Sequence, residues 1–78
     1  MEPIGIKKVT EIAGIGAVYG EKLKKSGFEY AYILLGQFLL HKKKEHIFTE
    51  WLIFNFQINK RYAKSCFNCL NEWCISNI

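Results

Sequence analysis

Residues 10–23 read TEIAGIGAVYGEKL, and this stretch decides the fold that the sequence predicts. Thr10 is a plausible N-cap for a short helix that runs to Ala13. The Gly14–Ile15–Gly16 segment stops that helix, and a second helix is expected over 17–26. Two short helices joined by a glycine turn are typical of a helix-hairpin-helix motif.

The glycine turn suggests a specific chemistry. Gly14 and Gly16 permit a tight turn and carry no side chain, so that a phosphate can approach the exposed backbone amides. Ile15 between them is expected to plug the turn into the core, and Lys22 is placed to reach the same or a neighbouring phosphate. Such a site holds the sugar–phosphate backbone and reads no base edges. Because many helical hairpins turn on glycine for structural reasons alone, that simpler interpretation stays open.

Outward from this stretch, apolar residues recur with helical spacing in three more segments. Helices are expected over 30–40, 45–57 and 60–75, and Asn59 is a natural N-cap for the last of them. The β-branched and aromatic residues of 30–40 leave a strand as the competing interpretation there. The sequence therefore predicts an all-α, compact bundle of about five short helices, organised as a single domain over residues 1–78.

Two features of these helices indicate a function. Gly36 lies in the middle of the 30–40 helix, where Gly costs about 1 kcal/mol relative to Ala, and such a glycine usually means that something packs against the backbone. Lys60, Arg61 and Lys64 occupy the first turn of the last helix, where cations oppose the helix dipole. This local conflict favours a basic functional surface.

The composition excludes several classes of protein. The 78 residues are 50% hydrophobic with a single Pro, which excludes a disordered tail or a low-complexity linker. No uncharged stretch approaches the roughly 20 residues of a spanning helix, so no membrane insertion is expected. Eleven Lys and Arg against seven acidic residues give a net charge of +4, which favours a polyanionic partner. The two Trp, six Phe and four Tyr exceed what a small interior holds, which favours dimerisation or partner binding.

No catalytic or metal site is evident in the sequence. The chain has no Asp and its serines lack a nearby His, so neither an enzyme activity nor a cofactor is expected. Cys66, Cys69 and Cys74 have the spacing C-x2-C-x4-C without a fourth ligand nearby, which makes zinc binding the weaker interpretation. Because Cys66 and Cys74 share a helical face with Leu70, we expect these thiols in the core.

Six segments are distinctive as a set: AGIG at 13–16, GxKL at 20–23, GF at 27–28, AYxxLGQFL at 31–39, FxEWL at 48–52 and CFxCLxEWC at 66–74. Together they make the chain resemble the barrier-to-autointegration factor family over nearly its whole length. The resemblance implies an all-helical, SAM-like homodimer that binds double-stranded DNA without sequence preference and bridges two duplexes. It also implies binding to LEM-domain proteins of the inner nuclear membrane and to lamin. The implied location is the nucleus, at chromatin and the nuclear envelope, and the cytoplasm.

The resemblance also assigns residues to two surfaces. The DNA contacts would come from the hairpin and the start of the last helix, at Gly14, Ile15, Gly16, Val18, Lys22, Asn59, Lys60 and Lys64. The dimer interface would comprise Leu35, Gly36, Phe38, Leu39, Trp51 and Leu52.

Three departures from the family leave an alternative function open. The family usually carries a further N-terminal segment that forms a first helix, and this chain is expected to lack it. Residues 53–56 are apolar where the family is more polar, and Lys64 stands where the family usually has Arg. The alternative is a protein-interaction module that dimerises with full-length family members and has weak or no DNA binding.

Overall fold

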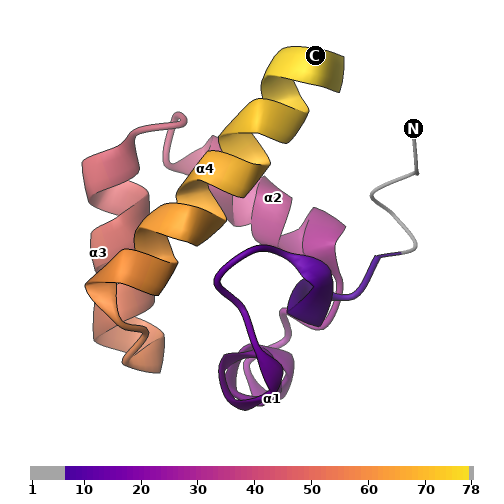
Figure 1. The fold of residues 1–78 in the computed structure, drawn as a ribbon, viewed down its shortest axis with the longest axis vertical. Helices are drawn as coiled ribbons and strands as arrows, with labels where there is room; N and C mark the ends of the chain where they lie inside the picture. The colour runs from indigo at the N-terminus through magenta and orange to yellow at the C-terminus, as the bar shows by residue number, and fades with distance from the viewer. Residues whose placement is uncertain (1–6, 78) are drawn as a thin grey trace.

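The computed structural model describes residues 7–77, which form four α-helices and one 3-10 turn (Figure 1). In chain order the elements are η2 (Val9–Glu11), α1 (Ala17–Lys25), α2 (Ala31–Leu40), α3 (Glu45–Phe56) and α4 (Lys60–Asn77). The predicted all-α fold class is confirmed, and the ambiguous 30–40 segment is a helix. The α-helices end within two residues of the predicted limits. Residues 1–6 and 78 of the predicted domain lie outside the described residues.

The first predicted helix is wrong in both its length and its cap. Thr10 lies inside the single turn η2, and the residue before that turn is Lys8, whose amide donates to Oε2 of Glu11 at 2.9 Å. Ile12, which follows the turn, is buried and already has an extended backbone. A helix of one turn has almost no stability of its own, so the packing of Ile12 decides where it ends. Residues 7–77 therefore form four α-helices and a 3-10 turn, where the sequence analysis predicted about five helices.

An extended contact holds the described N-terminal end against the start of α2. Lys8 and Tyr30 form an antiparallel β-bridge. The amide of Val9 donates to the carbonyl of Glu29 and the amide of Ala31 donates to the carbonyl of Lys7, both at 2.9 Å. These bonds fix the segment before η2 in an extended conformation, which periodicity in the sequence does not reveal.

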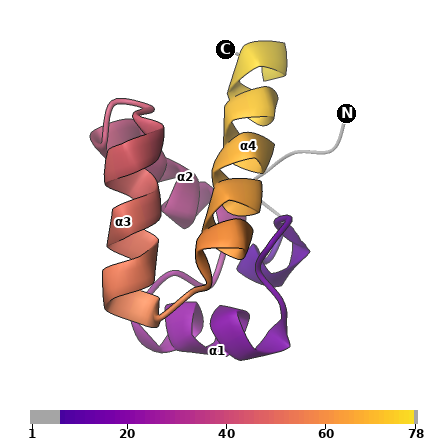
Figure 2. The same ribbon diagram turned by 60° about the vertical axis from the view of Figure 1, so that its left-hand side comes forward.

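The helices α3 and α4 lie side by side and run in opposite directions (Figure 2). The connection between them begins at Gln57, which has a left-handed backbone (φ 54°) and ends α3. Helix α1 lies across one end of this pair, below the last turn of α3 and the first turn of α4 (Figure 2). The start of α4 is thereby brought to the same end of the molecule as the hairpin.

The core is apolar and draws a fully buried side chain from every element. Its largest fully buried members are Phe38, Phe48, Leu23, Leu34, Leu52, Ile58, Leu70, Val9 and Cys66. The ring of Phe38 lies 5.4 Å from the rings of both Phe48 and Phe67, centroid to centroid. Burying one such side chain contributes about 1.5–3 kcal/mol, so α2, α3 and α4 are held together mainly by this cluster.

Two of the three cysteines belong to this core, as predicted. Cys66 and Cys74 are buried, while Cys69 is half-buried. Burial raises the pKa of the Cys66 thiol well above its ordinary value, and the neighbouring Cys69 adds to the shift, so Cys66 is a neutral thiol. Within residues 7–77 no cluster of three His, Cys, Asp or Glu side chains is placed to hold a metal ion. No helix in this part of the chain is both long and apolar enough to cross a bilayer.

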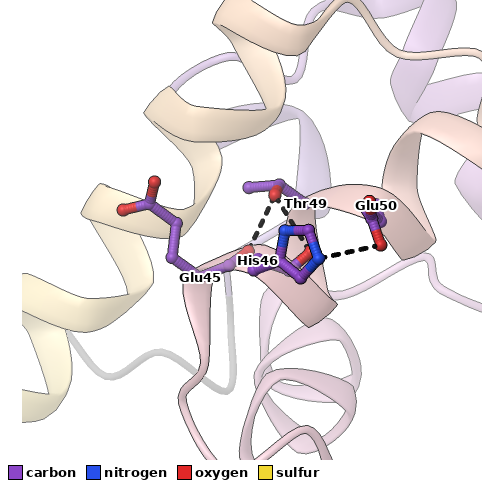
Figure 3. A network of polar contacts seen from close by, with 4 residues as sticks. All are labelled: Glu45, His46, Thr49 and Glu50. Atoms are coloured by element: carbon purple, nitrogen blue, oxygen red, sulfur yellow. Dashed lines mark hydrogen bonds and ion pairs between the residues drawn. The ribbon is translucent and has the colours of Figure 1, made fainter.

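The exposed side of α3 carries a small polar network (Figure 3). Nε2 of His46 lies 3.4 Å from Oε2 of Glu50 one turn later, and the hydroxyl of Thr49 donates to the carbonyl of Glu45 at 2.7 Å. The side chains of His46 and Glu50 are 81% and 53% exposed, so water screens their interaction. The network follows from helical spacing and leaves the fold almost unaffected.

Candidate nucleic-acid interface

Gly14, the first glycine of the turn, is packed against α4. Its φ is +85°, a region that residues with a side chain rarely adopt. A Cβ atom here would also overlap the backbone carbonyl of Tyr62 and lie 3.2 Å from the amide nitrogen of Cys66. Close packing by the chain itself therefore requires Gly14. The sequence had suggested a different reason, the approach of a phosphate.

Gly16, the second glycine, faces open space. Nothing lies within 4 Å of where its Cβ would be, and its φ of −90° is accessible to any residue. It is the N-cap of α1 and provides no side chain to accept hydrogen bonds from the first-turn amides. The first backbone bond of the helix runs from the amide of Gly20 to the carbonyl of Gly16, at 2.8 Å. The amides of Ala17, Val18 and Tyr19 in the first turn are thus available to an external acceptor, and the helix dipole favours an anion there.

The turn is anchored by one apolar side chain and followed by an exposed one. Ile15 is 2% exposed, which confirms that it plugs the turn into the core, and its amide donates to the carbonyl of Ile12 at 3.0 Å. Val18, one turn further along, is 70% exposed. The backbone of the turn is therefore held rigidly while its outer surface stays open.

A cavity of about 430 Å³ lies beside the turn. It is lined by Gly14, Ile15, Gly16, Ala17, Val18, Tyr19 and Tyr62. All but the last belong to the turn and the start of α1, and Tyr62 comes from the first turn of α4. The rings of Tyr19 and Tyr62 lie 6.2 Å apart and link the two helices.

The start of α4 supplies the positive charge at this end of the molecule. Asn59 caps the helix, because its Oδ1 accepts the amide of Arg61 at 2.8 Å. Its own amide donates to the hydroxyl of Tyr19 at 3.4 Å, which ties this cap to α1. Lys60, Arg61 and Lys64 are all exposed, and the first turn contains no acidic residue.

Lys22 makes a contact that the sequence analysis did not identify. Its Nζ donates to the backbone carbonyl of Phe56 at 3.2 Å and lies 5.9 Å from the centre of the Tyr19 ring. Since Phe56 ends α3, the ammonium group sits at the negative end of that helix dipole and ties α1 to α3. The sequence missed this contact because the two residues are 34 positions apart and no periodic pattern links them.

The six residues of the predicted dimer interface divide into two groups. Leu35, Phe38 and Leu52 are buried in the core of the single chain, at 8%, 0% and 0% exposure. Gly36 and Leu39 are exposed on α2, and Trp51 is half-buried on α3. Helical spacing from Gly36 also brings Tyr32 and Leu40, which the sequence analysis did not select, onto the same face. We call Tyr32, Gly36, Leu39 and Leu40 the α2 face; its three large side chains are 50%, 39% and 72% exposed.

The sequence of the chain is similar to one family of known proteins. The family model described as "Barrier to autointegration factor" matches residues 1–77. The chain is 56% identical to Barrier-to-autointegration factor 1 of Caenorhabditis elegans, over 92% of the chain and 81% of the relative. It is 51% identical to the human Barrier-to-autointegration factor, over 94% of the chain and 82% of the relative. The Drosophila melanogaster protein of the same name is 48% identical, over 94% and 81%.

The chain belongs to the barrier-to-autointegration factor family, and the resemblance noted in its motifs is confirmed. Members of this family are DNA-binding chromatin proteins without enzymatic activity. The chain is accordingly a chromatin protein of this type, and the expectation that it is not an enzyme is confirmed by its family.

Proposed function

We propose that the chain binds double-stranded DNA without sequence preference, and that as a dimer it bridges two duplexes. One observation carries the proposal: the N-terminal ends of two helices lie together at one end of the molecule. The start of α1 at Gly16 has no side chain that caps its amides, and the start of α4 at Lys60 is basic. Backbone amides and fixed cations are the groups that hold phosphates. Neither reads a base edge, so binding is expected to be independent of sequence.

The proposed contact residues have different roles in this site. Gly14 and Ile15 shape the turn, Gly16 and Val18 face the duplex, and Asn59, Lys60 and Lys64 form the basic helix start. Lys22 contributes a positive charge at a fixed position, because its ammonium group is hydrogen-bonded to the carbonyl at the end of α3.

The α2 face is the proposed dimer contact, with Trp51 of α3 as a further member. Its exposed side chains are apolar, and Gly36 leaves the backbone open because nothing lies within 4 Å of where its Cβ would be. Two helices can therefore approach closely at Gly36. A dimer formed there would carry one hairpin site per subunit, which is what bridging requires. Family membership supports LEM-domain proteins and lamin as further partners, and the nucleus and cytoplasm as locations.

The binding proposal is tested by fluorescence anisotropy with a random-sequence duplex at several salt concentrations. We expect the logarithm of the association constant to fall linearly with the logarithm of salt concentration, with a slope of about −0.9 for each phosphate neutralised. Absence of binding at low salt by a folded dimer would contradict the proposal.

The site itself is tested at Gly16 rather than at Gly14, because a side chain at Gly14 would disturb the packing of α4. Gly16→Glu places a carboxylate at the mouth of the turn and should weaken binding more than tenfold, since it blocks and repels phosphate. Gly16→Ala is the matched control, and the two variants should have similar thermal midpoints, because each replaces the N-cap glycine of α1 by a poorer capping residue. Retained affinity in Gly16→Glu would show that the duplex binds elsewhere.

A second function is supported by one observation: Phe54 and Leu40 are 77% and 72% exposed. Large exposed apolar side chains favour a protein-interaction module that pairs with full-length family members and binds DNA weakly. Co-expression with a full-length member, followed by a mass measurement of the complex, distinguishes the two functions. A heterodimer without DNA affinity would support this second function, and homodimers alone would count against it.

A further inference from the structure

Tyr62 adds a group to the hairpin cavity that a helix-hairpin-helix motif does not require. Its side chain is 48% exposed, and among the residues that line the 430 Å³ cavity it alone comes from outside the 14–19 segment. The backbone carbonyl of Tyr62 packs against Gly14, which fixes the residue beside the turn. Its ring lies 6.2 Å from the ring of Tyr19, at an angle of 58°, so α1 restrains it from one side.

We propose that Tyr62 is a DNA-contact residue whose hydroxyl group donates a hydrogen bond to a phosphate oxygen of the duplex. This inference rests on the proposed DNA binding and adds a residue to that same site. The neighbouring donors are the backbone amides at the start of α1, which attract a phosphate group, and the exposed cations Lys60 and Lys64 belong to the same end of α4 as Tyr62. A phosphate group held at this cavity therefore lies next to Tyr62, which lines the cavity from α4.

The chemistry of tyrosine suits this position. Lys and Arg side chains are long and lose considerable conformational freedom when they are ordered on a ligand. Tyr has two side-chain torsions, and here a second ring and the backbone of α4 already restrict them. Its hydroxyl group therefore orients a phosphate at small entropic cost. The aromatic ring that carries this hydroxyl group offers an apolar surface to the neighbouring deoxyribose.

A neutral donor has a distinctive experimental signature. A cation that neutralises a phosphate releases counterions, so its removal lowers the salt slope by about one unit. A tyrosine hydroxyl group releases none. Removing it should weaken binding by the same factor at every salt concentration and leave the slope unchanged. A loss of affinity caused by displaced lysines would change the slope instead.

The test compares Tyr62→Phe with Tyr30→Phe by anisotropy on a fluorescein-labelled random-sequence duplex of 20 base pairs, chosen as about two helical turns. Tyr30 is a matched control, because it is a half-buried tyrosine outside both proposed surfaces and its ring lies 6.1 Å from that of another tyrosine, Tyr32. Phenylalanine at position 62 keeps the ring contact with Tyr19, so the fold is preserved. We expect Tyr62→Phe to bind roughly five- to tenfold more weakly than the wild type with the same salt slope, and Tyr30→Phe to bind as the wild type does.

Each other outcome has a defined meaning. Wild-type affinity in Tyr62→Phe, or an equal loss in Tyr30→Phe, would overturn the role of Tyr62 while DNA binding stands. A changed salt slope in Tyr62→Phe would overturn it as well, because the loss would then come from a cation. If the folded wild-type protein does not bind the duplex at all, the proposed function fails and this inference fails with it.

Discussion

Gly14 and Gly36 have opposite surroundings. At Gly14 the chain's own backbone fills the space that a side chain would need, and the positive φ excludes other residues as well. At Gly36 nothing in the described chain lies within 4 Å of where a Cβ would be, and the residue sits in the middle of a helix that glycine weakens. The fold of one subunit therefore requires glycine at position 14 but gives no structural reason for glycine at position 36. A second chain that packs against α2 at this position would supply that reason.

The surfaces around the two glycines differ in the same way. The hairpin end presents backbone amides and the exposed cations of α4, which suit a phosphate chain. The α2 face presents Tyr32, Leu39 and Leu40, which suit an apolar partner. A molecule with these two surfaces can hold a duplex at one and a second subunit at the other.

The largest effect is expected from Gly14→Ala. The left-handed backbone costs an alanine roughly 1–2 kcal/mol, and overlap with the carbonyl of Tyr62 adds about the same again. We therefore expect the free energy of unfolding, measured by urea denaturation, to fall by about 3 kcal/mol.

Gly16→Ala is the control, since it adds the same methyl group two residues away in open space. Its free energy of unfolding should fall by no more than about 1 kcal/mol, because alanine is a poorer N-cap residue than glycine. Equal losses of stability in the two variants would show that a methyl group is unfavourable anywhere in the turn. The contrast between a packed and an open glycine would then be wrong.

The next effect is expected from Lys22→Met, which tests whether Lys22 holds the hairpin helix to α3. The variant loses the hydrogen bond to the carbonyl of Phe56 and the charge at the end of α3, and we expect a loss of about 1.5 kcal/mol in the free energy of unfolding. Lys25→Met removes the same charge from an exposed position of α1 and should change stability little. If Lys25→Met is equally destabilised, net charge rather than the specific contact is responsible.

Much of the fold was predictable because it depends on local patterns. Helical spacing of apolar residues located each α-helix that the structure describes, and the position of Ile15 between two glycines correctly predicted that it is buried. The spacing of Cys66 and Cys74 correctly placed both in the core. The predicted helix at Thr10 failed because the hydrogen bond from Val9 to the distant Glu29 and the burial of Ile12 decide the conformation there.

The candidate site was predictable only in part, because its key contacts are tertiary. The sequence identified the glycine turn and the basic start of α4, but no pattern in it indicates that these two features lie close together in the fold. It also could not show that Gly14 faces α4, that Lys22 reaches the end of α3, or that Tyr62 lines the cavity. In the same way, helical spacing placed Phe38 and Gly36 on one helix without showing which of the two is buried.

The smallest effect is expected from Gly36→Ala, and its sign should depend on protein concentration. In a monomer the added methyl group enters open space, so the better helix propensity of Ala should raise the free energy of unfolding by about 0.8 kcal/mol. In a dimer that packs at Gly36 the same methyl group separates the two backbones and weakens association. Urea denaturation at low and high protein concentration should therefore show stabilisation in the first case and a smaller or reversed effect in the second.

Gly36→Glu extends this test, because a charge buried between two subunits should leave only monomers in sedimentation velocity while the helix content measured by circular dichroism is retained. A dimer that persists in this variant would remove the α2 face from the interface. Gly36 would then remain unexplained by either one subunit or two. If instead the dimer is lost and the monomer stays folded, the two glycines have separate roles. Gly14 is then required for the fold of the subunit, and Gly36 is required for dimerisation.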